Sequence, residues 1–166
     1  QIIGVIIGNS ETGPRALGNR SLICDGTNKD AVNFLNTKIK KRSPFRPTAP
    51  VMQESIAKKY YVVRDELIDC YKTMSATAKC KEGSESLNFP TTHIDKTARI
   101  QIIDKDHFLY KLLDALKNYN IHLLANSSLN LSGDPTSFDL IDSFMISSRS
   151  PLKYIITDFA LLESIK

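Results

Sequence analysis

Two arginines with the chemistry of an anion-binding loop lie in segment 13–21, which reads GPRALGNRS. Glycine and proline favour an irregular backbone there, and glycine lets the backbone approach a ligand closely. The planar guanidinium of Arg15 or Arg20 offers a fork of donors that matches phosphate and carboxylate oxygens. The segment therefore predicts an anion site. An equally open alternative is that the two arginines pair with Glu11 or Asp25 and brace a turn.

A second basic group follows at Lys40, Lys41 and Arg42, with Arg46 shortly after it. Residues 14–50 hold eight Lys or Arg and two Asp, so this segment carries +6 while the whole chain carries +4. Phosphoryl and adenylyl transfer need fixed cations where negative charge develops on phosphate oxygens. Taken alone, however, cations at the end of a helix are better explained by their favourable interaction with the helix C-terminus.

Polar side chains in two later segments could bind the same kind of ligand. Arg99 stands at the start of an expected strand, where it would clamp a phosphate. Asn126, Ser128 and Asn130 follow a buried apolar run and could hold a ribose, a phosphate or a carbamoyl amide. The alternative for these three is a loop whose side chains satisfy its own backbone.

No metal site is expected in this chain. His93 and Asp95 supply only two ligands, and the spacing of Cys70 and Cys80 is not that of a CxxC pair. The other histidines, His107 and His122, are interpreted as ordinary helix and strand residues.

Hydrophobic periodicity predicts the elements that must position these groups. We expect strands at 2–7, 60–63, 98–103, 121–125 and 153–157, and helices at 28–41, 51–59, 106–119 and 139–146. Alternating strands and helices favour an α/β fold with a mixed sheet. Segments 8–21, 93–99 and 126–133 are loops beside strand ends, where such folds bind ligands, and 76–90 is an exposed loop.

Size and composition indicate one ordinary domain over residues 1–166. No apolar run approaches the roughly 20 residues of a membrane helix, so no membrane partner is expected. Three cysteines with irregular spacing suggest a reducing, cytoplasmic setting. The chain opens on Gln1 and enters an apolar strand at once, which we interpret as a piece of a longer polypeptide.

Four segments in register resemble the C-terminal domain of the O-carbamoyltransferase family, which includes nodulation, cephamycin and tobramycin carbamoyltransferases. The matching patterns are E-x-G-P-R-A-L-G-N-R-S at 11–21, N-x-x-I-K-x-R-x-x-F-R-P-x-A-P at 36–50, H-x-D-x-T-A-R-x-Q at 93–101 and an N-T-S-x-N-like loop at 126–130. One such motif could arise by chance, but four in order are specific.

In that family the domain is similar to YrdC-like proteins, whose K-x-R and S-x-N signature is matched here by Lys40, Arg42, Ser128 and Asn130. The resemblance implies a YrdC-like twisted mixed β-sheet flanked by helices, with a concave basic face. One departure from the family pattern lies close to Arg99, where Lys96 stands in place of the common glycine and adds bulk and charge.

The resemblance implies binding of carbamoyl phosphate and of ATP with Mg²⁺, and formation of a carbamoyl adenylate with release of phosphate and pyrophosphate. An N-terminal domain of the actin-like ATPase superfamily, which holds a metal ion, would then transfer the carbamoyl group to a hydroxyl acceptor. This chain lacks that domain and would not complete the transfer alone.

The same resemblance assigns a role to each candidate residue. The catalytic residues would be Lys40 and Arg42, holding the triphosphate, and Arg99, holding carbamoyl phosphate or the developing adenylate. Phosphate and nucleotide would also be bound by Arg15, Arg20, Ser128, Asn130 and Asn126, and Arg46 is a weaker candidate.

The main alternative is a basic YrdC-like module that binds RNA without carbamoyl chemistry, because a +6 segment attracts nucleic acid. Stacking of bases on aromatic side chains usually accompanies such binding. Phe34 and Phe45 are the aromatic residues near the basic group, so nucleic acid is not the expected partner. A catalytically silent supporting domain is a third possibility.

Overall fold

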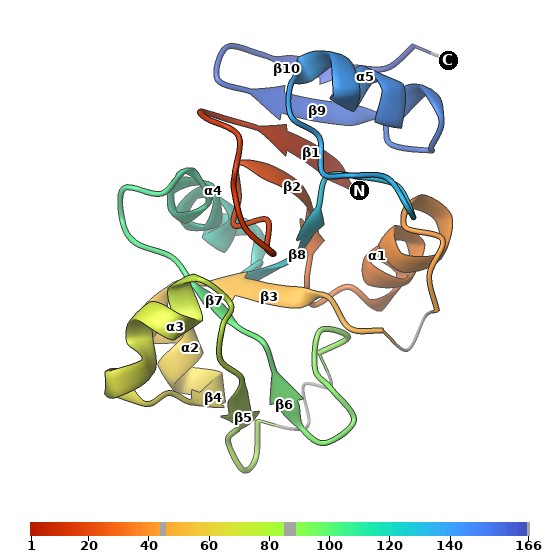
Figure 1. Cartoon of the computed structure of the whole chain (residues 1–166). Helices are drawn as coiled ribbons and strands as arrows, with labels where there is room; N and C mark the ends of the chain where they lie inside the picture. The colour runs from red at the N-terminus through yellow and green to blue at the C-terminus, as the bar shows by residue number, and fades with distance from the viewer. Residues whose placement is uncertain (44–45, 85–88, 166) are drawn as a thin grey trace.

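A seven-stranded sheet forms the centre of the molecule, as the computed structural model in Figure 1 shows. The structure describes residues 1–43, 46–84 and 89–165. The strand order is β10-β9-β1-β2-β8-β3-β7, with β1 parallel to β9, β3 parallel to β7 and the other neighbours antiparallel. Its strands are β1 (Ile3–Ile6), β2 (Arg20–Asp25), β3 (Ala49–Met52), β7 (Gln101–Ile102), β8 (Leu123–Ser128), β9 (Tyr154–Thr157) and β10 (Leu161–Glu163).

A smaller antiparallel sheet, in the order β4-β5-β6, lies below the first in Figure 1. Its strands are β4 (Tyr61–Val62), β5 (Ala78–Cys80) and β6 (Thr97–Ala98). The helices are α1 (Lys29–Phe34), which continues as the π-helix η1 (Leu35–Ile39), then α2 (Glu54–Tyr60), the 3-10 helix η2 (Asp65–Leu67), α3 (Ile68–Lys72), α4 (Phe108–Leu116), which continues as the 3-10 helix η4 (Lys117–Tyr119), and α5 (Leu140–Ser148). The expected α/β fold with a mixed sheet is confirmed.

Helices cover both faces of the large sheet, because its central strands bury side chains on both sides. Val5 of β1 and Ile23 of β2 pack with Leu109 and Leu113 of α4. Leu22 of β2 packs on the opposite face with residues from α1, η1 and α5. Successive residues of a strand point to opposite faces, which explains why neighbours in β2 belong to different clusters. In Figure 1, α4 and α1 accordingly stand on opposite sides of the sheet.

Capping residues fix the starts of two helices that the periodicity predicts. The side chain of Asn28 accepts from the backbone N–H of Ala31 at 3.0 Å and so caps α1. Asp139 caps α5 in the same way by accepting from the backbone N–H of Asp142 at 3.0 Å. Such caps satisfy N–H groups that the first helical turn leaves unpaired.

Several predicted boundaries are wrong. Val51 and Met52, assigned to a helix, form β3 and are fully buried between β7 and β8. The expected strand at 98–103 is two strands in different sheets. Strand β8 continues through Asn126, Ser127 and Ser128, which were assigned to a loop.

Three further strands were not anticipated. They are β2 (Arg20–Asp25), which begins inside the expected loop 8–21, β5 (Ala78–Cys80), which lies within the expected exposed loop 76–90, and β10 (Leu161–Glu163). Residues 85–88 of that loop lie outside the described part of the chain, as do Pro44 and Phe45 of the second motif. Across the described residues, the structure has no helix of the length and apolarity needed to cross a membrane.

Candidate phosphate-binding site

Four arginines converge on one cavity of about 350 Å³. Arg15 comes from the loop before β2, Arg42 and Arg46 from the segment between η1 and β3, and Arg99 from the link between β6 and β7. The floor is formed where β3 begins and β8 ends, since Ala49 pairs with Asn126 in adjacent antiparallel strands. Segments far apart in the sequence therefore bring their positive side chains to one end of the central strands.

No carboxylate lines this cavity among the described residues. Nη2 of Arg42 and Nε of Arg99 are buried and have no hydrogen-bond partner within the described part of the chain, and the same holds for Oγ1 of Thr48 and Oδ1 of Asn126. An unpaired buried polar group costs roughly 1–3 kcal/mol, and charged groups cost more. Two of these atoms are guanidinium donors and a third is a hydroxyl, which an anion can satisfy, whereas Oδ1 of Asn126 is an acceptor and needs a donor.

Mutual repulsion of these arginines adds to the cost of their burial. The pKa of Arg42 is lowered to about 10 by burial and by the charges of Arg46 and Arg99. The pKa of Arg99 is also lowered, by burial first and then by the charges of Arg15 and Arg46. Binding of an anion at the centre of the four would relieve this repulsion.

The end of η1 aims Arg42 at the cavity. Asn36, which is 1% exposed, accepts from Nε of Arg42 at 2.8 Å and donates from Nδ2 to the carbonyl of Arg46 at 3.1 Å. Lys41 has a φ of 46°, a left-handed conformation that turns the chain out of the helix. Arg42 is thereby held as part of the wall, while its Nη2 is left without a protein partner within the described residues.

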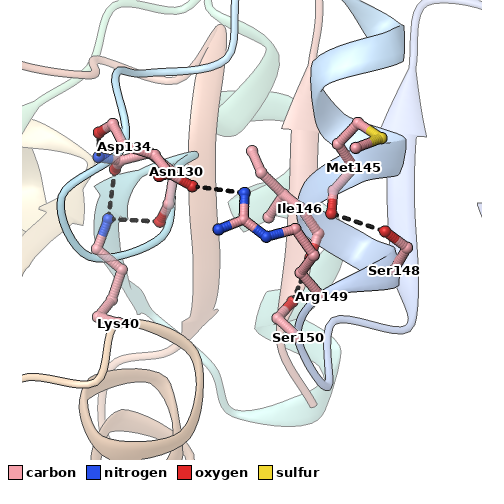
Figure 2. A network of polar contacts seen from close by, with 8 residues as sticks. All are labelled: Lys40, Asn130, Asp134, Met145, Ile146, Ser148, Arg149 and Ser150. Carbon is pink, nitrogen blue, oxygen red and sulfur yellow. Dashed lines mark hydrogen bonds and ion pairs between the residues drawn. The ribbon is translucent and has the colours of Figure 1, made fainter.

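Lys40 does not line the cavity but lies behind the end of β8. Its side chain is 6% exposed, and its ammonium donates to the carbonyls of Ser128 and Asn130, both at 2.9 Å, to Oγ of Ser128 at 3.2 Å and to Oδ1 of Asn130. Burial and the charges of Arg42 and Arg46 lower its pKa to about 7. Lys40 thus ties together the two S-x-N residues, and Figure 2 shows it pointing at Asn130.

Ser128 lines the cavity, whereas Asn130 lies outside it. The hydroxyl of Ser128 donates to Oδ1 of Asn130 at 2.6 Å, and Asn130 donates from Nδ2 to the carbonyl of Asp134 at 2.6 Å. Arg149, just after α5, forms an ion pair with Asp134 at 3.1 Å (Figure 2). The turn after β8 is thus held from Lys40 on one side and from the end of α5 on the other.

Asn126 fixes the glycine- and proline-rich loop against the sheet. Its Nδ2 donates to the carbonyl of Ala16 at 2.9 Å and to Oε1 of Gln101 at 2.9 Å. Nε2 of Gln101 in turn donates to the carbonyl of Leu17. These contacts hold the loop so that Arg15 and Ala16 lie at the cavity wall. Gln101 therefore supports the site, and the only sequence signal for this role is its position in the third motif.

Arg20 is not brought to the cavity with the other arginines. It is 5% exposed, and its guanidinium donates to the carbonyls of Ile7, Asn19, Gly8 and Phe138 at 2.9–3.1 Å. Glu11 accepts instead from three backbone N–H groups, those of Leu17, Asn19 and Arg20. The bracing of a turn anticipated for Arg20 is present, but its partners are carbonyls and not a carboxylate.

His93 borders both this cavity and a neighbouring one of about 490 Å³. The neighbouring cavity has an aromatic wall, in which the rings of Tyr60 and Phe89 meet edge to face with centroids 5.3 Å apart. The sequence singled out His93 only as a potential metal ligand. Among the residues that the structure describes, no group of three or more His, Cys, Asp or Glu side chains is placed to hold a metal ion.

Comparison with known proteins gives one family match over residues 1–163, to the family described as carbamoyltransferase C-terminus. The nodulation protein NolNO of Sinorhizobium fredii is 32% identical over 148 residues, which cover 86% of this chain and 21% of that protein. The nodulation protein NolO of Bradyrhizobium diazoefficiens is 31% identical over 157 residues, which cover 91% of this chain and 28% of NolO.

A 3'-hydroxymethylcephem-O-carbamoyltransferase of Streptomyces clavuligerus is 31% identical over 138 residues, or 81% of this chain and 25% of that protein. The chain therefore spans between about a fifth and somewhat more than a quarter of the length of these curated relatives.

Proposed function

Because this chain belongs to the carbamoyltransferase C-terminus family, we propose that it is the activating domain of an O-carbamoyltransferase. It binds ATP and carbamoyl phosphate and forms carbamoyl adenylate. The remainder of the polypeptide then passes the carbamoyl group to a hydroxyl acceptor. The name of the Streptomyces relative supports transfer to an oxygen, and its greater length supports a further domain for that step.

The observation that carries this proposal is the cavity lined by Arg15, Arg42, Arg46 and Arg99, with no carboxylate among its described lining residues. ATP and carbamoyl phosphate repel each other strongly, so a site that holds both needs several fixed cations. A structural arginine cluster would instead be expected to contain acidic partners, because buried charges are otherwise too costly.

The proposed reaction balances with one water molecule. Hydrolysis of carbamoyl phosphate breaks its O–P bond and gives carbamate and phosphate. An oxygen of the carbamate then attacks the α-phosphorus of ATP, forms the carbamoyl–AMP bond and displaces pyrophosphate. Charge moves onto phosphate oxygens in both steps, where the buried guanidinium donors of Arg42 and Arg99 would stabilise it.

The roles of the other residues follow from their positions. Ser128 lies at the wall, where its hydroxyl would turn from Asn130 to donate to a phosphate, while Lys40 and Asn130 hold the turn. Mg²⁺ would arrive with ATP and be held by phosphate oxygens and water, since the described wall offers no carboxylate. The nucleoside would extend past His93 into the aromatic cavity beside Tyr60 and Phe89.

Calorimetric titration of ATP, with and without carbamoyl phosphate, tests this proposal. We expect ATP binding and a release of pyrophosphate that depends on carbamoyl phosphate. Arg42→Ala should weaken ATP binding roughly 10- to 100-fold, the cost of one lost charge-assisted bond. Arg64→Ala removes an exposed arginine outside the cavity and should leave the titration unchanged.

Salt distinguishes this function from RNA binding. Contacts with many phosphates of a nucleic acid would weaken binding by orders of magnitude between about 50 and 200 mM salt. A site for one nucleotide should lose far less affinity and should prefer ATP to GTP. Tight, strongly salt-dependent RNA binding without a nucleotide preference would contradict the proposal.

A further inference from the structure

Helix α5 has an inverted pattern: two of its three buried residues, Ser143 and Ser147, are polar, whereas its exposed side is largely apolar. The third buried residue, Ile146, belongs to the core cluster on one face of the large sheet. On the outer side, Ile141, Phe144 and Met145 are 70%, 48% and 56% exposed. Phe138, just before the helix, is 70% exposed. A surface helix of a globular protein normally has a polar outer face, so an outer face with several large apolar side chains marks a surface that another element covers.

We propose that the α5 surface, formed by Phe138, Ile141, Phe144 and Met145, is the docking surface for the rest of the longer polypeptide in which this domain occurs in its relatives. The family is a C-terminal domain, and the matched segments of the relatives cover only 21–28% of their lengths. Most of each relative therefore lies outside this domain and is available to cover such a surface.

The position of the start of the chain supports this occupant. Gln1 and Ile2 line a cavity of about 390 Å³ together with Phe34 of α1 and Pro151, which lies in the loop after α5. Polypeptide joined at Gln1 would therefore leave the domain beside this loop. A tethered partner has a high effective concentration, so a surface of four apolar side chains is enough to hold it.

A second copy of this chain is the less favoured occupant. Stable association of free chains usually needs about 800 Å² of surface from each partner, far more than four side chains supply. The nearby sheet edge, β10, is only three residues long, which limits pairing of strands between copies.

A membrane surface is also less favoured. Segment 138–148 contains Asp139 and Asp142 and no Lys or Arg, so an anionic lipid surface would repel it. The α5 surface combines exposed apolar side chains with this acidic character, which suits a protein partner.

Hydroxyl-radical footprinting tests the proposal by comparing the 166-residue chain with the longest natural polypeptide that contains it. Met145 should be oxidised readily in the short chain and on the order of tenfold more slowly in the long one, because docking excludes solvent from its side chain. Tyr119, which is 77% exposed beyond α4, is the internal control and should react equally in both.

Phe144→Ser should restore oxidation of Met145 in the long polypeptide, whereas Tyr119→Ser should not. Equal oxidation of Met145 in both proteins would overturn the proposal. So would protection in the short chain that grows with its own concentration, which would indicate a second copy. Because footprinting needs neither ATP nor turnover, its result is independent of the proposed activation chemistry.

Discussion

The two arginines of the first motif have opposite surroundings, although they lie only five residues apart. Arg15 is exposed at the cavity wall, whereas Arg20 is buried and saturated by four carbonyls. The same guanidinium chemistry is therefore available to a ligand at Arg15 and is used by the backbone at Arg20. The same reasoning separates Arg42, which faces the cavity, from Lys40, which holds the turn behind it.

Substitution of these two arginines should separate binding from stability. Arg20→Gln should lower the free energy of unfolding by about 3 kcal/mol, because four part-buried carbonyls lose a charged donor. Arg15→Gln should change it by less than about 0.5 kcal/mol, as is usual at exposed positions, but should weaken ATP binding. Urea unfolding and calorimetry on both variants measure this. Weak ATP binding by a fully stable Arg20→Gln protein would contradict the assignment.

The buried amine of Lys40 should make stability depend on pH. The pKa of Lys40 is lowered from 10.5 to about 7 in the folded chain. Between pH 7 and pH 10.5, the amine is therefore neutral in the folded chain and still protonated in the unfolded chain. The unfolding free energy contributed by Lys40 therefore rises with pH in this window, by about 1 kcal/mol per pH unit. Below pH 7 both states are protonated, and the full penalty of burying the charge remains.

The measurement is the difference in unfolding free energy between the natural chain and Lys40→Met, followed from pH 7 to about 10. As the pH rises, the unfolding free energy of the natural chain should increase relative to that of Lys40→Met. Lys105→Met, which removes an exposed lysine before α4, is the control for general effects of pH and charge. A difference that stays flat across the window would show that the amine keeps its proton when buried.

At the scale of elements, the loop between β1 and β2 is attached to α4 through Gly18 and His107. A ring nitrogen of His107, Nε2, lies 3.0 Å from the carbonyl of Leu17. Gly18 has a φ of 129°, and a Cβ there would stand 2.5 Å from Cε1 of the same ring. Only glycine allows the loop to approach the helix this closely.

Gly18→Ala should therefore destabilise the fold by roughly 2–4 kcal/mol, through backbone strain and displacement of His107. Gly13→Ala is a matched control, since Gly13 has a similar φ of 117° but open space around its Cβ position. Gly13→Ala should lower the free energy of unfolding by the backbone strain alone, about 1–2 kcal/mol. Thermal and urea unfolding of both variants give the comparison, and equal losses would rule out a contribution from the contact with His107.

The sequence predicts the elements whose apolar residues repeat at helical or strand spacing, such as α4 and β1. It fails where tertiary pairing overrides local pattern. Val51 and Met52 fit a helix until β7 and β8 bury them from both sides. Polar Asn126 and Ser127 look like loop residues, yet β8 continues through them because both pair with β2 and Asn126 also pairs with β3.

The candidate site was also predictable in part: the sequence points to residues of the cavity wall but does not show which residues support that wall. Residue types and motifs identified most of the cavity wall, including Arg15, Arg42, Arg99 and Ser128. They could not separate cavity residues from the supports behind them, because Lys40, Asn130 and Arg20 differ from the wall residues only in the contacts that folding provides. Thr48 and Asn36 carried no chemical signal of their own, since threonine and asparagine are common in loops and helix ends.

At the scale of the whole molecule, the arginine cavity is a source of instability that a ligand should remove. A ligand that binds only the folded chain at about 100 times its Kd adds about 3 kcal/mol to the free energy of unfolding. Pyrophosphate, which resembles the displaced product, should therefore raise the Tm by roughly 5–10 °C in a chain of this size. Differential scanning calorimetry measures the shift.

Arg99→Ala should remove most of this stabilisation by pyrophosphate and should itself melt at or above the Tm of the natural chain, because it relieves repulsion within the cluster. Sodium chloride at matched ionic strength is the control for screening of charge. A pyrophosphate effect that survives in Arg99→Ala at full size would place the anion elsewhere on the protein.

The position of β1 has a consequence for how the chain is made. The first strand of this domain to leave a ribosome lies inside the sheet, paired with β2 on one side and with β9 on the other, where Ile3 meets Tyr154. Its second partner is thus among the last segments of the domain to be synthesised. Long-range pairings of this kind slow folding, and until β9 arrives one edge of an apolar strand stays open to other chains. During translation this domain should depend on chaperones, and premature termination before β9 should give an aggregating fragment and not a smaller folded protein.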